Sequence, residues 1–131
     1  MILVDTNVLI DILSRDENWY CWSKAALVAR SIEGLLINEI VYAELAPRYE
    51  SERTLDDAIA EFDLAFERAP KSALYAAGRT FDAYRRRGGT RTSLLPDFFI
   101  GAHAAAAGIP ILTRYARRYQ TYFPDVALIA P

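Results

Sequence analysis

The sequence predicts an α/β fold in which a short central parallel sheet is covered by helices on both faces. Short apolar runs of strand length alternate along the chain with longer amphipathic segments of helical periodicity. Parallel strands that are buried on both faces are typically continuous apolar runs, and helices connect them. With 131 residues, the chain is expected to form one domain, spanning 1–131, around one core.

Four strands are expected, and each is short. Residues 2–4 and 35–37 are apolar throughout, and 109–113 and 126–129 are the third and fourth candidates. The carboxyl ends of parallel strands meet at one edge of a sheet, where ligand sites of such folds form. Side chains that directly follow these strands are therefore candidate functional residues.

The segments between the strands carry helix signals at their ends. Asp5 or Thr6 can cap the first helix, and Asn38 can cap the third. Pro96 suits the first turn of the last helix, and Gly108 follows its end. The predicted helices cover residues 7–14, 20–32, 39–45, 55–66, 72–86 and 96–107.

Composition excludes several classes of protein. Apolar residues make up 53% and charged residues 24% of the chain, as in a globular protein rather than a disordered one. No apolar run approaches the roughly 20 residues that span a bilayer, and the first residues lack the basic segment of a signal peptide. A cytoplasmic location is therefore expected. The lone Cys21 allows no intramolecular disulfide and no cysteine zinc site, and we expect a partly buried thiol.

Charge is divided unevenly along the chain. Residues 1–67 hold 5 Lys or Arg and 14 Asp or Glu, whereas residues 68–131 hold 10 and 3, so their formal charges are −9 and +7. Arginines concentrate in 85–91 and 114–118, which indicates contact with a polyanion or an acidic partner. For the arginines of 85–87 the alternative is stabilisation of a helix C-terminus.

Three acidic residues stand out because their neighbours are apolar. Asp5 follows the first strand, Glu44 shares a helical stripe with Ile40 and Val41, and Asp97 begins a strongly apolar helix. Alone, Asp5 could cap a helix, Asp97 could favour the positive end of its helix, and Glu44 could turn to solvent. Together they indicate a site, because a carboxylate in apolar surroundings needs a partner or a cation.

The residue types indicate which cation such a site would hold. Converging carboxylates repel each other and raise each other's pKa, and a divalent cation relieves this repulsion. Carboxylate oxygens suit Mg²⁺ or Mn²⁺ better than zinc, so one of these is the expected cofactor. The lone His103 does not share a helical face with Asp97 and is expected to be a surface or core residue. Asp11 is expected to be an ordinary exposed helix residue.

Four segments, in this order, resemble the motifs of PIN-domain proteins, and most of all those of VapC-type toxin ribonucleases from type II toxin–antitoxin systems. They are 4–10 (VDTNVLI), 38–45 (NEIVYAEL), 95–104 (LPDFFIGAHA) and 111–114 (ILTR). The first segment alone is moderately specific, but the four together cover essentially the whole chain. The resemblance implies a PIN-like three-layer α/β/α fold.

The resemblance also implies a Mg²⁺- or Mn²⁺-dependent endoribonuclease that hydrolyses RNA, forms a homodimer and is neutralised by a cognate antitoxin. By motif, Asp5, Glu44 and Asp97 are its catalytic, metal-binding acids. Asn7 and Thr113 are catalytic neighbours that orient a carboxylate, a water or a phosphate. The candidates for RNA backbone contacts are the arginines of 85–91 together with Arg114, Arg117 and Arg118.

One motif departs from the family's pattern. The family commonly has a fourth acid shortly after the last motif, where this chain has Tyr115 and, three residues on, Arg118. Asp125 lies too far along the chain and is expected in a turn. The missing acid leaves open a one-metal nuclease, a weakened enzyme, or a module that binds RNA or antitoxin without turnover. A phosphatase-like enzyme with Asp5 as nucleophile is disfavoured, because no aspartate follows two residues later.

Overall fold

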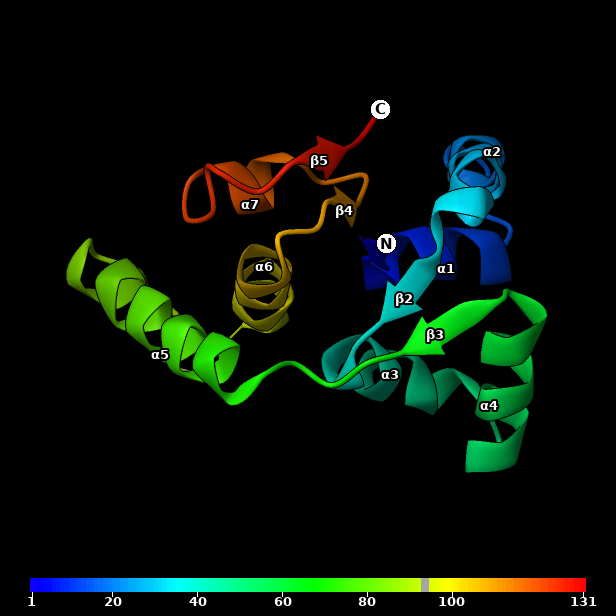
Figure 1. The fold of residues 1–131 in the computed structure, drawn as a ribbon, viewed down its shortest axis with the longest axis horizontal. Helices are drawn as coiled ribbons and strands as arrows, with labels where there is room; N and C mark the ends of the chain where they lie inside the picture. The colour runs from blue at the N-terminus through cyan, green and yellow to red at the C-terminus, as the bar shows by residue number, and fades with distance from the viewer. Residues whose placement is uncertain (93–94) are drawn as a thin grey trace.

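A parallel sheet with its first strand at the centre organises the molecule (Figure 1). The computed structural model describes residues 1–92 and 95–131. Within these residues the sheet has five strands in the order β3-β2-β1-β4-β5, and every neighbouring pair is parallel. The strands are β1 (Ile2–Val4), β2 (Leu35–Ile37), β3 (Leu64–Phe66), β4 (Ile111–Leu112) and β5 (Leu128–Ile129).

Helices lie on both sides of this sheet. Figure 1 shows α1 and α2 on one side and α5 and α6 on the other, which confirms the predicted three-layer α/β/α fold. The helices are α1 (Thr6–Leu13), α2 (Tyr20–Arg30), α3 (Glu39–Leu45), α4 (Glu52–Glu61), α5 (Lys71–Arg86), α6 (Pro96–Ala107) and α7 (Arg117–Gln120). In the described residues no helix is long and apolar enough to cross a membrane.

The prediction was wrong for residues 55–66, which were expected to form one helix. The helix α4 begins earlier, because Ser51 and Thr54 form a capping box in which each side chain accepts a hydrogen bond from the other's backbone N–H. It ends before Asp63, which adopts a left-handed φ of 53°. The chain then continues as β3, an edge strand that pairs with β2.

The short helix α7 was also missed, and it supplies part of the candidate site. Its four residues are too few to show helical periodicity. The fully buried ring of Tyr119 anchors it to the rest of the molecule. Beyond it, Asp125 lies in a turn, as expected.

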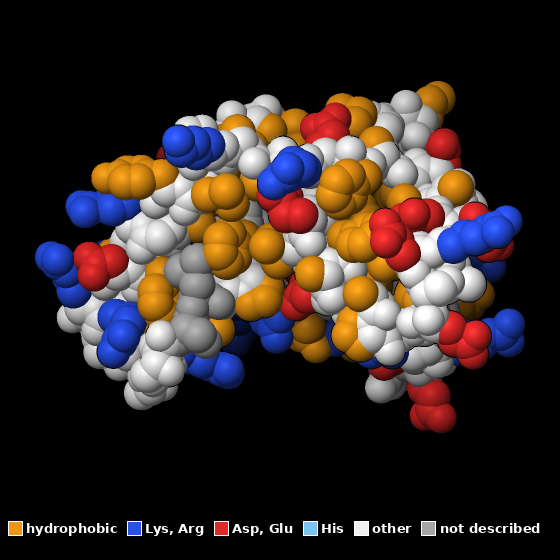
Figure 2. All heavy atoms as spheres, turned by 90° about the horizontal axis from the view of Figure 1, so that it is seen from below, with side chains coloured by type: hydrophobic (Ala, Val, Ile, Leu, Met, Phe, Trp, Pro, Cys, Tyr) orange, Lys and Arg blue, Asp and Glu red, His pale blue; other side chains and the backbone are white. Residues whose placement is uncertain are grey.

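Charge is segregated in space as it is along the chain. On the face drawn in Figure 2, Lys and Arg side chains gather at the end formed by α5, whereas most of the Asp and Glu side chains lie toward the opposite end, with some Lys and Arg among them. Cys21 is exposed, so the expectation of a partly buried thiol was wrong.

Candidate functional site

Asp5 directly follows the carboxyl end of the central strand β1, and only 3% of the residue is exposed. It occupies the N-cap position of α1, but its side chain makes no capping hydrogen bond, which argues against the simple capping role. Instead its Oδ2 accepts hydrogen bonds from Asn7 Nδ2 at 2.5 Å, Thr113 Oγ1 at 2.7 Å and Tyr119 Oη at 2.9 Å. In the part of the chain that the structure describes, all side-chain hydrogen bonds of Asp5 end on this one oxygen, so Oδ1 remains available to a ligand.

Asn7 and Thr113 form a buried polar pair that fixes this carboxylate. Asn7 Nδ2 also donates to Thr113 Oγ1 at 3.1 Å, and Asn7 Oδ1 accepts from the backbone N–H of Arg114 at 3.1 Å. Thr113 Oγ1 in turn accepts from the backbone N–H of Tyr115 at 3.0 Å. The predicted neighbours of Asp5 are therefore in contact with it, and they tie the start of α1 to the loop after β4.

Tyr119 is a member of this cluster that sequence reasoning missed. It donates to Asp5 across 114 positions of the chain, and no motif or spacing in the sequence marks it. Burial, aided by the charge of Asp5, raises its pKa well above the ordinary value. The hydroxyl therefore stays protonated and remains a donor to the Asp5 carboxylate.

Glu44 approaches the same region from α3. Its Oε2 accepts a hydrogen bond from the hydroxyl of Thr6, the first residue of α1. The residue as a whole is exposed, so its carboxylate lies at the rim of the molecule rather than in the core. The contact with Thr6 shows that it is nevertheless held beside the start of α1.

Asp97 comes from the first turn of α6, and 26% of its side chain is exposed. Its Oδ2 lies 3.7 Å from Nη1 of Arg118 on α7. Arg118 and Asp97 line a surface cavity of about 330 Å³. The other lining residues are Glu44, Arg91, Leu95 and Pro96.

The three acids influence one another electrostatically. Burial raises the pKa of Asp97 above its ordinary value, the charge of Arg118 opposes this rise, and the carboxylates of Asp5 and Glu44 add to it. Burial likewise raises the pKa of Glu44, the hydrogen bond from Thr6 opposes the rise, and the charge of Asp5 adds to it. Asp5, Glu44 and Asp97 therefore form a region of incompletely balanced negative charge, which we call the acid cluster.

The donor chemistry of the acid cluster fits a hard divalent cation. Its ligands would be carboxylate oxygens, and a cation would offset both the burial and the mutual repulsion that raise the pKa values of Glu44 and Asp97. Among residues 1–92 and 95–131, no three His, Cys, Asp or Glu side chains are gathered closely enough to ligate one ion. Thr6 holds Glu44 and Arg118 faces Asp97, so ligation by all three acids would require these side chains to shift.

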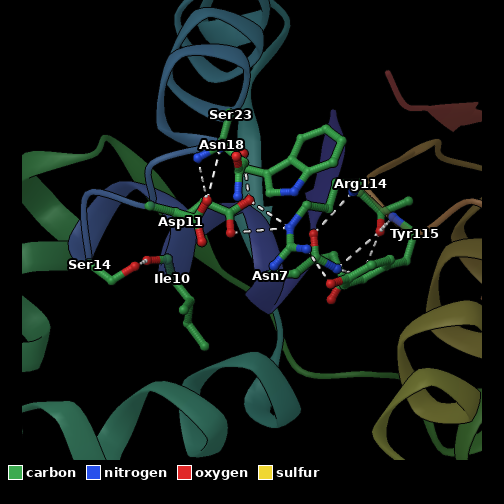
Figure 3. Close-up of polar contacts among 12 residues, drawn as sticks. Asn7, Ile10, Asp11, Ser14, Asn18, Ser23, Arg114 and Tyr115 are labelled. Carbon is green, nitrogen blue, oxygen red and sulfur yellow. Dashed lines mark hydrogen bonds and ion pairs between the residues drawn. The ribbon is translucent and has the colours of Figure 1, made fainter.

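Asp11 was expected to be exposed, and this was wrong because it carries the main ion pair beside the site. It is 1% exposed, and Arg114 Nε donates to its two carboxylate oxygens at 3.1 and 2.8 Å (Figure 3). Ser23 Oγ on α2 donates to Asp11 Oδ2 at 2.8 Å. The Arg114 guanidinium also lies over the rings of Trp19 and Tyr115, 5.5 and 4.3 Å from their centroids.

This ion pair removes Arg114 from the candidate RNA contacts. Its side chain is 15% exposed, and its charge is committed to Asp11. Arg117 and Arg118, by contrast, are exposed and remain available.

His103 lies in the core, 2% exposed, and its Nδ1 is 3.3 Å from Nδ2 of Asn38. Asn38 caps α3 as predicted, because its side-chain oxygen accepts from the backbone N–H groups of Ile40 and Val41. Burial lowers the pKa of His103, so the ring is neutral and can accept a hydrogen bond from Asn38. His103 is thus a satisfied core residue.

Comparison with known proteins gives one family. The PIN domain family matches residues 2–123. Among curated proteins, none matches the sequence significantly.

Several solved structures share the fold. One is a chain of VapBC2 from Rickettsia felis, in a complex with a DNA fragment from the VapBC2 promoter. It superposes with a TM-score of 0.74 at 17% identity, and the match covers 100% of this chain and 99% of that one. A chain of VapBC-1 from nontypeable Haemophilus influenzae gives 0.71 at 18% identity, covering 99% and 98%. A chain of a toxin-antitoxin complex from Klebsiella pneumoniae gives 0.68 at 22% identity, covering 100% and 98%.

Proposed function

Because this chain belongs to the PIN domain family, we propose that it is a metal-dependent endoribonuclease that acts as the toxin of a toxin–antitoxin pair. The observation that carries the proposal is the acid cluster at the carboxyl edge of the sheet. Asp5 is oriented there by three neutral donors, and its charge raises the pKa values of Glu44 and Asp97. A purely structural carboxylate in such a place would be expected to have a cationic partner.

Asp5, Glu44 and Asp97 would hold the metal ion, which we propose to be Mg²⁺ or Mn²⁺. When bound, such an ion acidifies water and offsets negative charge on phosphoryl oxygens. Asn7, Thr113 and Tyr119 keep Oδ2 of Asp5 occupied, which fixes the direction in which Oδ1 points. Since these donors are buried, the carboxylate needs no reorganisation when a ligand arrives.

Arginines around the acid cluster supply the charge that a polyanionic substrate needs. Arg91 and Arg118 line the same cavity as Glu44 and Asp97, so a phosphate bound to one of these guanidinium groups would lie beside the acids that are proposed to hold the metal ion. The arginines at the end of α5 extend positive charge away from this cavity. Such contacts give affinity for the RNA backbone and little choice of sequence.

We further propose a cognate antitoxin as partner, a homodimer as the assembly and the cytoplasm as the location. Support for the antitoxin comes from structural neighbours, which are chains of VapBC and toxin-antitoxin complexes. The acidic and basic ends of the surface offer charge complementarity to a partner with its own charged segments.

The test is cleavage of structured RNA by the purified chain with Mg²⁺ or Mn²⁺, and without metal in EDTA. We expect metal-dependent cleavage in the parent and background cleavage in Asp5→Asn, which keeps the shape of the side chain but removes its charge. Asp57→Asn is the matched control, because this acid is exposed on α4. Equal cleavage by Asp5→Asn and the parent would show that the proposed site is wrong.

The second candidate function is a binding module without turnover, which the environment of Tyr115 favours. Where a fourth acid is expected, the centroid of the Tyr115 ring lies 4.3 Å from the guanidinium of Arg114 and 4.4 Å from that of Arg118. Tyr115→Asp separates the two functions. Cleavage by this variant alone would support the binding module, and equal cleavage by parent and variant would show that the fourth acid is dispensable.

A further inference from the structure

We propose that Arg118 is a built-in cation of the acid cluster, which occupies Asp97 in the metal-free protein and must be displaced from it by the metal ion. This inference rests on the proposed function, since it concerns the same metal site. It assigns Arg118 a role in setting the metal affinity, beyond contact with the RNA backbone.

The first support is the position of the guanidinium. Its Nη1 lies 3.7 Å from Asp97 Oδ2, and both side chains line the cavity that Glu44 also borders. A metal ion that used Asp97 as a ligand would bind the same carboxylate that Arg118 now faces. The ion and the guanidinium are both positive, so their presence at one carboxylate is mutually unfavourable.

The second support is that Arg118 is held in place from two sides. Its backbone N–H donates to the carbonyl of Tyr115 at 3.0 Å, and its guanidinium lies 4.4 Å from the centroid of the Tyr115 ring. The next residue on α7, Tyr119, is fully buried and donates to Asp5. One short helix therefore brings a neutral donor to Asp5 and a cation to Asp97.

The third support is the balance of charge. The three ionised acids carry −3, of which Arg118 offsets one charge and a divalent ion in its place offsets two. Arg117, its neighbour on α7, forms no ion pair with the acid cluster among the described residues.

The contact is suited to exchange rather than to permanent structure. The Arg118 side chain is 52% exposed, and an ion pair at such exposure is screened by water. Because Arg118 lines the cavity, a guanidinium released from Asp97 can form a bidentate contact with a phosphate of the substrate that binds there. Arg118 would thus pass from an acid in the free protein to a phosphate in the complex.

The test measures Mn²⁺ binding by calorimetry in the parent, Arg118→Gln, Arg118→Lys and Arg117→Gln. We expect Arg118→Gln to bind Mn²⁺ about tenfold more tightly or better, because one adjacent charge shifts a carboxylate's affinity for protons by this order. Arg118→Lys keeps the charge and should stay near the parent. Arg117→Gln should change the affinity by less than about twofold, since Arg117 is exposed and forms no ion pair with these carboxylates in the part of the chain that the structure describes.

A second measurement works without metal. In EDTA at pH 8, Arg118→Gln should melt about 1–3 °C below the parent, since the acid cluster loses its cation. Arg117→Gln should melt with the parent.

The outcomes separate this inference from the proposed function. If the parent binds Mn²⁺ and Asp5→Asn does not, but Arg118→Gln binds no tighter than the parent, the metal site stands and the role of Arg118 is overturned. An equal gain in Arg117→Gln would also overturn it, because the effect would then be one of net charge. If no variant binds Mn²⁺, the metal site fails, and the melting curves in EDTA alone decide whether Arg118 serves as the cation of the acid cluster.

Discussion

Asp5 directly precedes α1, and Asp11 lies within this helix. Both residues are almost fully buried, but they differ in how their charge is balanced. Asp11 faces Arg114, which donates to both of its carboxylate oxygens. In the residues that the structure describes, the Asp5 carboxylate accepts side-chain hydrogen bonds only from neutral donors, and its charge acts on Glu44 and Asp97. Burial by itself therefore does not show whether an acid is paired with a cation inside the protein, whereas its hydrogen-bond and ion-pair partners do.

The difference also assigns the two regions to different tasks. The Asp11–Arg114 pair connects α1 to the loop after β4, and Ser23 brings α2 into the same network (Figure 3). The charges of this pair balance each other within the protein, so the pair holds the loop that carries Tyr115 against α1. The acid cluster keeps negative charge that a cation outside the chain can balance.

The largest effect on stability is expected when the carboxylate of Asp11 is removed. Asp11→Ala leaves the Arg114 guanidinium buried without its counter-charge, which should lower the free energy of unfolding by about 3–5 kcal/mol in urea titrations. The double variant with Arg114→Ala should lose less than the sum of the two single losses, because they share one interaction. Additive losses would show that the pair is not coupled. Asp57→Ala, an exposed acid on α4, is the control and should change stability little.

Tyr119→Phe tests the other carboxylate while it keeps the buried ring. The loss of one donor to Asp5 should lower the free energy of unfolding by about 1.5 kcal/mol, since hydrogen bonds to charged groups are the stronger ones. Cleavage should also fall, because Asp5 is less firmly oriented. Unchanged stability and unchanged cleavage together would contradict the role assigned to this hydroxyl.

The pH dependence of stability should distinguish the acid cluster from the paired acid. Burial raises the folded pKa values of Glu44 and Asp97 above their ordinary values of 4.5 and 3.8. The folded state then holds more protons than the unfolded chain above those values, so metal-free stability should fall as the pH rises through the folded pKa values. Melting curves in EDTA between pH 4 and pH 8 check this. Asp97→Asn or saturating Mn²⁺ should reduce the fall, and an undiminished fall would place its origin elsewhere.

The smallest effect is expected for an ion pair in solvent. Arg30 and Glu33 lie 2.9 Å apart, closer than Arg118 and Asp97, but their side chains are 45% and 44% exposed. Glu33→Gln should therefore cost less than about 0.5 kcal/mol in urea titrations. A loss comparable to that of Asp11→Ala would contradict the view that burial gives the Asp11–Arg114 pair its importance.

Local signals in the sequence predicted most of the strands and helices. Strand-length apolar runs located the central strands, and Pro96 and Gly108 bounded α6 as predicted. The same signals failed where the decisive interaction is not local. Residues 64–66 form a strand only because β2 offers an edge with which they pair. A hydrophobic segment of this length fits a helix or a strand equally well from its periodicity alone.

The sequence by itself determined the parallel α/β architecture and singled out Asp5, Glu44, Asp97, Asn7 and Thr113, because residue type and position after a strand are local properties. The tertiary structure alone decided how each buried charge is balanced. Asp11 meets Arg114 across 103 positions of the chain, and Asp5 meets Tyr119 across 114. It also placed Arg118 beside Asp97. The pairing of a buried carboxylate depends on which distant side chains the packing brings within a few ångströms, and no periodicity or spacing along the chain encodes that distance.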